Sequence, residues 1–131
     1  MIQLGSVLKV VDKTGIFTVI CLKVLNFSKN RIANLGDVIV VSVNTINLKR
    51  FAFLKVRLQK RYRQGSIHRA LIIRAKVNYC RVSGAYIKFD ENSCVLVTNK
   101  NVPVTNKVYG PVLREFCTRW PSLGCVSHCI V

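Results

Sequence analysis

Positively charged side chains are concentrated in one stretch of the chain, where they could bind phosphate groups. The 131-residue sequence has 21 Lys and Arg residues against five Asp and Glu, a formal net charge of +16. No Asp or Glu occurs between Val38 and Phe89, and twelve of the basic residues lie in that interval. Arginine donates two parallel hydrogen bonds to a phosphate, and lysine offers a compact positive charge. We therefore predict nucleic-acid contacts from this set: Lys49, Arg50, Lys55, Arg57, Lys60, Arg61, Arg63, Arg69, Arg74, Lys76, Arg81 and Lys88.

A solvated basic surface without a partner is the alternative, because runs of charge are commonly just hydrated. Half of the residues are hydrophobic, so the chain can bury a core and is not a disordered basic tail. A compact state with this net charge repels itself unless a polyanion neutralises it. A chain that can fold and that concentrates its positive charge in one segment favours a nucleic-acid partner.

Aromatic residues are interleaved with the charges between Leu48 and Arg69. Apolar and basic residues partly alternate from Phe53 to Leu58, which indicates an extended hairpin arm with one face on RNA. Tyr62 could stack on an unpaired base or pack against the core. For Phe51 and Phe53 we favour packing against the core, because aromatic residues usually serve it.

Groups that could support catalysis are few. The two histidines, His68 and His128, are far apart in the sequence and have no evident carboxylate to orient them. Asp90 and Glu91 are adjacent, so their side chains would diverge on a strand. No phosphate-binding glycine loop and no nucleophile elbow occurs. The sequence therefore predicts a protein that is not an enzyme and needs no cofactor.

Six cysteines raise the questions of disulfides and of metal binding. Without a secretory signal we expect them to remain thiols, with Cys21 and Cys94 buried as small hydrophobic residues. The tail cluster of Cys117, Cys125, His128 and Cys129 contains no C-x-x-C pair, and the last two would point to opposite faces of a strand. We predict no metal site.

Targeting and membrane signals are not evident. Met1 to Val11 has neither the apolar core of a secretory signal nor the Arg- and Ser-rich composition of a transit peptide. No apolar run approaches the roughly 20 residues that span a bilayer. A protein of the membrane surface would need a basic amphipathic helix, which the sequence does not reveal. We expect a soluble protein used in the compartment where it is made.

The elements that position these residues are predicted to be mostly β-strands. Val7–Val11, Phe17–Leu25 and Asp37–Thr45 are rich in β-branched residues, and an Asp-Lys-Thr-Gly turn at 12–15 separates the first two. Residues 26–36 form a polar connection that carries Lys29 and Arg31. Short strands joined by glycine-containing turns favour a closed barrel in so short a chain.

The block from Ala70 to Val97 packs several strands into one run. Leu71-Ile72-Ile73 predicts a strand buried on both faces, and the Ser83-Gly84 turn lets the chain double back. Ala85–Phe89 and Cys94–Val97 follow as strands, joined by the polar residues 90–92. The segment from Pro111 to Arg119 alone looks helical, with Pro111 at its first position and Pro121 as its stop.

An ordered set of fragments along nearly the whole chain resembles the universal family of ribosomal large-subunit protein fourteen, in its bacterial and organellar type. One fragment would be weak evidence, but the order makes the resemblance specific. The fragments are Met1-Ile2-Gln3, the Asp12 to Gly15 turn, Cys21–Leu25, Gly36–Ile39, Ala70–Val97, Gly110-Pro111-Val112 and Arg114-Glu115.

The resemblance implies one domain over residues 1–131, a mainly β fold with a five-stranded barrel, an extended hairpin arm and small C-terminal helical elements. The implied role is structural: binding large-subunit rRNA near the intersubunit face and helping to form a bridge to small-subunit rRNA. It also implies contacts with neighbouring large-subunit proteins and with a ribosome-silencing factor, for which Asn106 and Lys107 are the candidate patch. A free OB-like RNA-binding or RNA-chaperone protein is the alternative that charge alone leaves open.

Departures from the family pattern indicate the compartment in which the protein is found. The connection between Val43 and Gly65 is longer and more basic than in a bacterial-type member, and Trp120–Val131 matches poorly. This drift, with a composition rich in Cys, Phe, Ile and Asn, predicts a mitochondrial protein made inside the organelle and held in the ribosome of the matrix. The bacterial cytoplasm or a plastid is the alternative.

Overall fold

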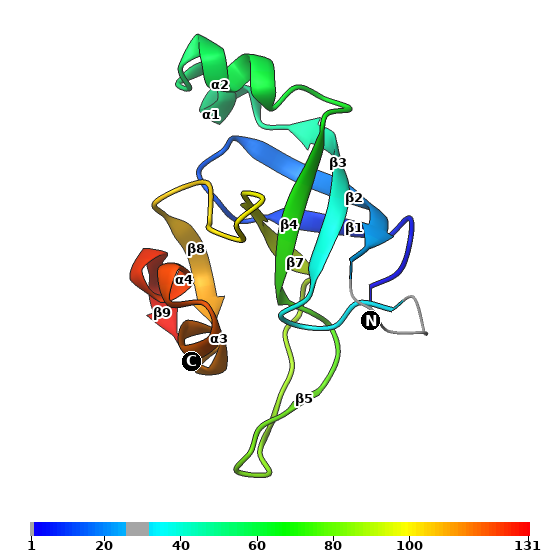
Figure 1. Ribbon diagram of the computed structural model, residues 1–131, viewed down its shortest axis with the longest axis vertical. Coiled ribbons are helices and arrows are strands. Elements are labelled where there is room, and N and C mark those ends of the chain that lie inside the picture. The colour runs from blue at the N-terminus through cyan, green and yellow to red at the C-terminus, as the bar shows by residue number, and fades with distance from the viewer. Residues whose placement is uncertain (1, 26–31) are drawn as a thin grey trace.

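The computed structural model describes residues 2–25 and 32–131, so the predicted basic connection at 26–36, with Lys29 and Arg31, lies mostly outside the described residues. Five strands form a closed barrel in the order β1-β2-β3-β4-β7 (Figure 1). Neighbouring strands are antiparallel except β1 and β7, which close the barrel in parallel. The barrel strands are β1 (Val7–Val10), β2 (Ile16–Val24), β3 (Val38–Ile46), β4 (Ile67–Arg74) and β7 (Ser93–Val97).

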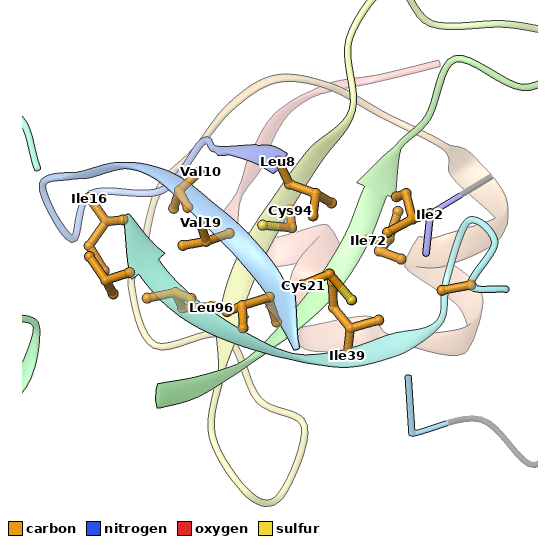
Figure 2. Packing of buried hydrophobic residues seen from close by; sticks show 14 of the residues in the cluster. Ile2, Leu8, Val10, Ile16, Val19, Cys21, Ile39, Ile72, Cys94 and Leu96 are labelled. Carbon is orange, nitrogen blue, oxygen red and sulfur yellow. The ribbon is translucent and has the colours of Figure 1, made fainter. Parts of the chain in front are cut away.

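The barrel interior is filled by aliphatic side chains from every strand. Leu8, Val19 and Ile72 are fully buried there, and Figure 2 shows them pointing into the same space. Cys21 and Cys94 belong to this cluster, which confirms their predicted role as buried small residues. Their thiols face apolar surroundings, so burial raises the pKa of both.

A second apolar cluster lies outside the barrel and explains the unbroken aliphatic runs. On β4, Ile72 points into the barrel whereas Leu71 and Ile73 face outward and are also buried. Strand β7 repeats this pattern, because successive side chains alternate between the two faces. The outward residues are covered by the C-terminal lobe, residues 108–131. The prediction of a strand buried on both faces is therefore confirmed.

The C-terminal lobe lies along one side of the barrel (Figure 1). It consists of β8 (Val108–Val112), α3 (Arg114–Arg119), α4 (Pro121–Val126) and β9 (Ser127–Ile130), with β8 and β9 paired in parallel. The helix predicted to start at Pro111 begins instead at Arg114, because Pro111 belongs to β8. Helix α3 ends before Pro121, as predicted. Pro121 is also the first residue of a second helix, α4, at a position where a backbone N–H would have no helical partner.

The arm predicted from Phe53 to Leu58 is wrong in its position. Helices α1 (Leu48–Ala52) and α2 (Val56–Arg61) occupy that segment. The apparent alternation spans the kink between the two helices, where the Gln59 amide donates to the carbonyls of Phe51 (3.1 Å) and Leu54 (3.0 Å). These hydrogen bonds stabilise the kink, whereas a hairpin would be stabilised by a ladder of bonds between strands.

The extended hairpin of the molecule is formed by β5 (Tyr79–Cys80) and β6 (Tyr86–Ile87). It projects from the end of the barrel opposite to α1 and α2 (Figure 1). Gly84 has a φ of +83° at its turn, as the Ser83-Gly84 prediction required. The strand β6 is shorter than the predicted Ala85–Phe89, since only two residue pairs form the ladder.

Candidate nucleic-acid interface

The two helices between β3 and β4, residues 48–61, are termed the basic helical pair. They sit beyond one end of the barrel (Figure 1). All the basic residues that they carry or that follow directly are solvent-exposed: Lys49, Arg50, Lys55, Arg57, Lys60, Arg61 and Arg63. No acidic residue occurs between Val38 and Phe89, so no side chain of this segment neutralises their positive charges.

Apolar anchors fix the basic helical pair to the barrel. Tyr62 is 2% exposed and belongs to the barrel core, with Phe51 and Leu58 packed against it. The Gly15 carbonyl accepts from the Asn47 N–H (2.8 Å) at the start of α1, joining the β1–β2 turn to the helix. The exposed charges are therefore held on a fixed support.

The aromatic prediction for this segment was wrong at Phe53, and the structure decides between the two alternatives for Tyr62. Tyr62 is buried and cannot stack on RNA, because its ring packs into the core and against His68 at 5.0 Å between ring centroids. Phe53 was expected to pack, but its side chain is 92% exposed at the kink after α1. Phe51 is half-buried, in agreement with the prediction.

Strand β4 leads from the basic helical pair to two very different arginines. Arg69, at the beginning of the strand, is exposed, and its guanidinium donates to the Asn99 carbonyl (3.4 Å). Lys100 lies in the same turn as Asn99 and lines a groove with Arg61 and Arg69. Lys100 was not among the residues predicted from the sequence; the signal for it is the acid-free Asn-Lys-Asn run at 99–101, directly after a strand.

Arg74, at the end of β4, is buried and engaged inside the protein. Its Nη2 donates to the Tyr109 carbonyl (2.8 Å), and its Nη1 lies 3.3 Å from Glu91 Oε1. Burial lowers the pKa of Arg74, against the opposing effect of Glu91. Gly110 has a φ of +86°, and a Cβ there would stand 2.6 Å from Arg74 Nη1. Arg74 therefore fastens the C-terminal lobe to the barrel and is not free for phosphate.

The remaining predicted residues lie towards the hairpin end of the molecule. Lys76 and Lys88 are exposed at the two sides of the hairpin base. Arg81 is partly buried, with Nε 3.0 Å from Glu115 Oε1 and Nη2 donating to the Val131 carbonyl. Eight of the twelve predicted residues therefore lie in or next to the basic helical pair, and Lys76 and Lys88 lie at the hairpin end. The other two, Arg74 and Arg81, make contacts within the protein.

The candidate patch Asn106 and Lys107 lies in the connection between β7 and β8. Both side chains are exposed, and the Lys107 carbonyl accepts from Thr105 Oγ1 (3.2 Å). Val108 is fully buried, whereas Tyr109 is 40% exposed with the Arg50 guanidinium 5.2 Å from its ring centroid. This contact links the basic helical pair to the C-terminal lobe.

Histidine and cysteine side chains are the remaining groups that could bind a metal. Within residues 2–25 and 32–131, no group of three His, Cys, Asp or Glu side chains is placed to hold a metal ion. In the same part of the chain, no helix is long and apolar enough to cross a membrane. Burial lowers the pKa of His68, whose Nε2 lies 2.9 Å from Ser66 Oγ and 3.2 Å from the Arg61 carbonyl. The ring is a fixed part of the structure near the groove.

Comparison with known protein families gives a match over the full sequence. The family model described as ribosomal protein L14p/L23e matches residues 1–131, the whole of this sequence. Members of that family are structural, non-enzymatic components of the large ribosomal subunit. The chain belongs to the ribosomal protein L14p/L23e family.

Proposed function

We propose that the chain binds large-subunit rRNA through the basic helical pair, together with Arg63 and Arg69. The observation that carries the proposal is the gathering of seven exposed cations at residues 49–63, in a segment that contains no Asp or Glu and is anchored to the barrel core. Exposed cations on a fixed frame bind a polyanion with little ordering cost, and release of its counterions drives association.

Lys76 and Lys88 form a second, smaller contact in this proposal, because they are exposed at the hairpin base. Arg74 and Arg81 hold the protein together instead of contacting RNA. Their guanidinium groups are committed to Glu91 and Glu115 and to backbone carbonyls. The rRNA thus meets the two ends of the barrel.

Asn106 and Lys107 are proposed as the intersubunit patch, which would help to form the bridge to small-subunit rRNA and meet neighbouring ribosomal proteins or a silencing factor. Their exposure supports this role. Lys107→Glu should weaken subunit joining or factor binding while large subunits still assemble, since a rim charge mainly tunes encounter. Normal joining and normal factor binding by subunits that carry the substitution would remove the proposal.

The proposed location is the mitochondrial ribosome, with a bacterial or plastid ribosome as the alternative. The long basic connection, which the structure resolves into α1 and α2, is the feature that supports it. Recovery of the chain with large subunits from protease-treated mitochondria is the expected result. Recovery only with cytoplasmic or plastid ribosomes would contradict this location.

Sucrose-gradient sedimentation tests the role in the subunit. The chain should co-migrate with the large subunit after a high-salt wash. A free RNA-binding or chaperone protein would instead move to the soluble fraction at moderate salt, because few phosphate contacts would hold it.

A triple substitution tests the rRNA surface. Neutralising Lys60, Arg61 and Arg63 to Gln should impair incorporation into the subunit and reduce the slope of log affinity against log salt by about two to three units. The barrel should stay folded, because all three side chains are exposed. The matched control neutralises three exposed cations elsewhere, Lys13, Lys23 and Arg114. Equal losses from both triple variants would show that net charge, not this surface, binds rRNA.

A further inference from the structure

A groove lies where the end of α2 meets the start of β4 and the turn after β7. Its volume is about 660 Å³, within the usual range of ligand pockets. Three cations line it: Arg61 from α2, Arg69 from β4 and Lys100 from the turn. Among the described residues no acidic side chain lines the groove, so a bound anion would meet only positive charge.

The apolar part of the groove is formed by Val40, Ile67 and Val97. Ile67 stands out, since its side chain is 64% exposed although it belongs to a barrel strand. The structure leaves this aliphatic surface uncovered directly beside three cations. A ligand that carries both a negative group and a flat apolar face would cover it.

We propose that this groove holds one unpaired nucleotide of an RNA strand. The phosphate binds to Arg61, Arg69 and Lys100, and the base lies over Ile67 and its two valine neighbours. The inference rests on the proposed rRNA binding and specifies one site within it. The site shares Arg61 and Arg69 with the proposed rRNA surface and adds Lys100 and the apolar residues at the junction of helix, strand and turn.

Geometry favours an unpaired nucleotide over the two other anionic ligands. A paired base is covered by its neighbours in the stack, so a duplex offers phosphates but no free ring for Ile67. An acidic peptide offers carboxylates on flexible stems and likewise no flat apolar face. Recognition of unpaired bases through an apolar surface beside phosphate contacts is physically well suited to RNA loops and bulges.

The groove has fixed walls, which makes selection by shape feasible. Arg69 donates to the Asn99 carbonyl (3.4 Å), which ties the strand to the turn that carries Lys100. His68 is held by Ser66 and by the Arg61 carbonyl, and its ring packs against the buried Tyr62. A nucleotide would therefore enter a site whose side chains are largely positioned beforehand.

The test compares two substitutions in the full chain by fluorescence anisotropy with three probes: a uridine hexanucleotide, a 12-base-pair RNA duplex and a hexaglutamate peptide. Ile67→Ser removes the apolar face without changing charge, and Val7→Ser is the control, an aliphatic residue 53% exposed on β1 and outside every proposed RNA contact. Ile67→Ser should weaken hexanucleotide binding about fivefold, the effect of losing roughly 40 Å² of apolar contact. It should leave the duplex affinity and the salt slope unchanged, and Val7→Ser should change the affinity for neither RNA.

Contacts at the groove provide the second readout. A nuclear Overhauser effect between the Ile67 methyl groups and uracil ring protons is expected in the hexanucleotide complex. Equal affinity of Ile67→Ser and wild type for the hexanucleotide would overturn the assignment of the groove to a nucleotide. In that case, binding of the duplex by wild type would still support the rRNA proposal. Binding of hexaglutamate as tight as that of the hexanucleotide would replace the nucleotide with an acidic peptide. Failure of wild type to bind either RNA would overturn both proposals.

Discussion

Replacing Arg74 with Met should loosen the C-terminal lobe and destabilise the protein without altering its affinity for RNA. The side chain is 8% exposed, and its guanidinium joins β4 to the Tyr109 carbonyl and to Glu91. Methionine keeps the apolar stem of arginine but cannot make these two interactions. The change therefore isolates the contribution of the guanidinium group.

The substitution removes one hydrogen bond and one ion pair from the folded protein. A hydrogen bond from a charged donor contributes about 1.5–3 kcal/mol. The ion pair adds at most about 1 kcal/mol, since Glu91 is 37% exposed and keeps Lys9 at 3.0 Å as a partner. We expect a loss of about 2–4 kcal/mol in the free energy of unfolding, a large part of the roughly 5–15 kcal/mol typical of a domain.

Urea unfolding measures the stability, and RNA titration at several salt concentrations measures the number of phosphate contacts. Arg69→Met is the matched control, because Arg69 lies on the same strand but is exposed. It should leave stability nearly unchanged and lower the salt slope by about 0.7–0.9. A double-mutant cycle with Glu91→Gln should give a coupling of about 0.5–1 kcal/mol. If Arg74→Met unfolds like wild type and lowers the salt slope as Arg69→Met does, Arg74 contacts RNA and does not fasten the C-terminal lobe.

Other expected outcomes follow from buried groups. Asp12 accepts hydrogen bonds from the Leu96 N–H (3.1 Å) and from Thr14, so Asp12→Asn should cost about 1–3 kcal/mol in urea unfolding, because the amide turns an N–H towards a donor; an unchanged midpoint would contradict this. Burial raises the pKa of the Asp12 carboxyl group, so the folded state binds its proton more tightly than the unfolded state does. Stability should therefore fall as pH rises from the ordinary Asp range through the raised pKa. Urea unfolding at several pH values should show this fall in wild type and a smaller one in Asp12→Asn. Exposed Cys80, Cys125 and Cys129 should react with a thiol reagent before buried Cys21 and Cys94; mass spectrometry of the labelled native protein checks this, and early labelling of Cys94 would argue against the barrel core.

Much of the barrel was predictable because its strands carry strong local patterns. The unbroken run at Leu71 to Ile73 predicts burial on both faces, and the structure supplies a barrel interior on one side and the C-terminal lobe on the other. The glycine at position 84 predicts the hairpin turn for a backbone reason that no neighbour can override.

The basic helical pair could not be predicted from periodicity. Each helix is only five or six residues long, too short to show a helical repeat, and the kink between them imitates strand alternation. The bonds from Gln59 to backbone carbonyls decide the outcome, and they depend on the kink having already formed.

The sequence located the charges of the candidate surface but not their burial. Arg69 and Arg74 look alike in the sequence, yet one faces solvent and the other fastens the C-terminal lobe. That distinction arises because Glu91 and Tyr109, 17 and 35 residues further along the chain, meet Arg74 only in the folded protein. Lys100 was missed for the same reason, since the fold alone brings it beside Arg61 and Arg69.

A map of protein–RNA crosslinks in the assembled large subunit would show which residues of this chain contact rRNA. Ultraviolet crosslinking followed by mass spectrometry of the peptides should place most rRNA adducts in residues 48–69 and 98–100, with a smaller number near Lys76 and Lys88. Lysines of the basic helical pair should also be protected from acetylation in the subunit. Crosslinks confined to the C-terminal lobe, with Lys49, Lys55 and Lys60 freely acetylated in the subunit, would contradict rRNA binding through the basic helical pair.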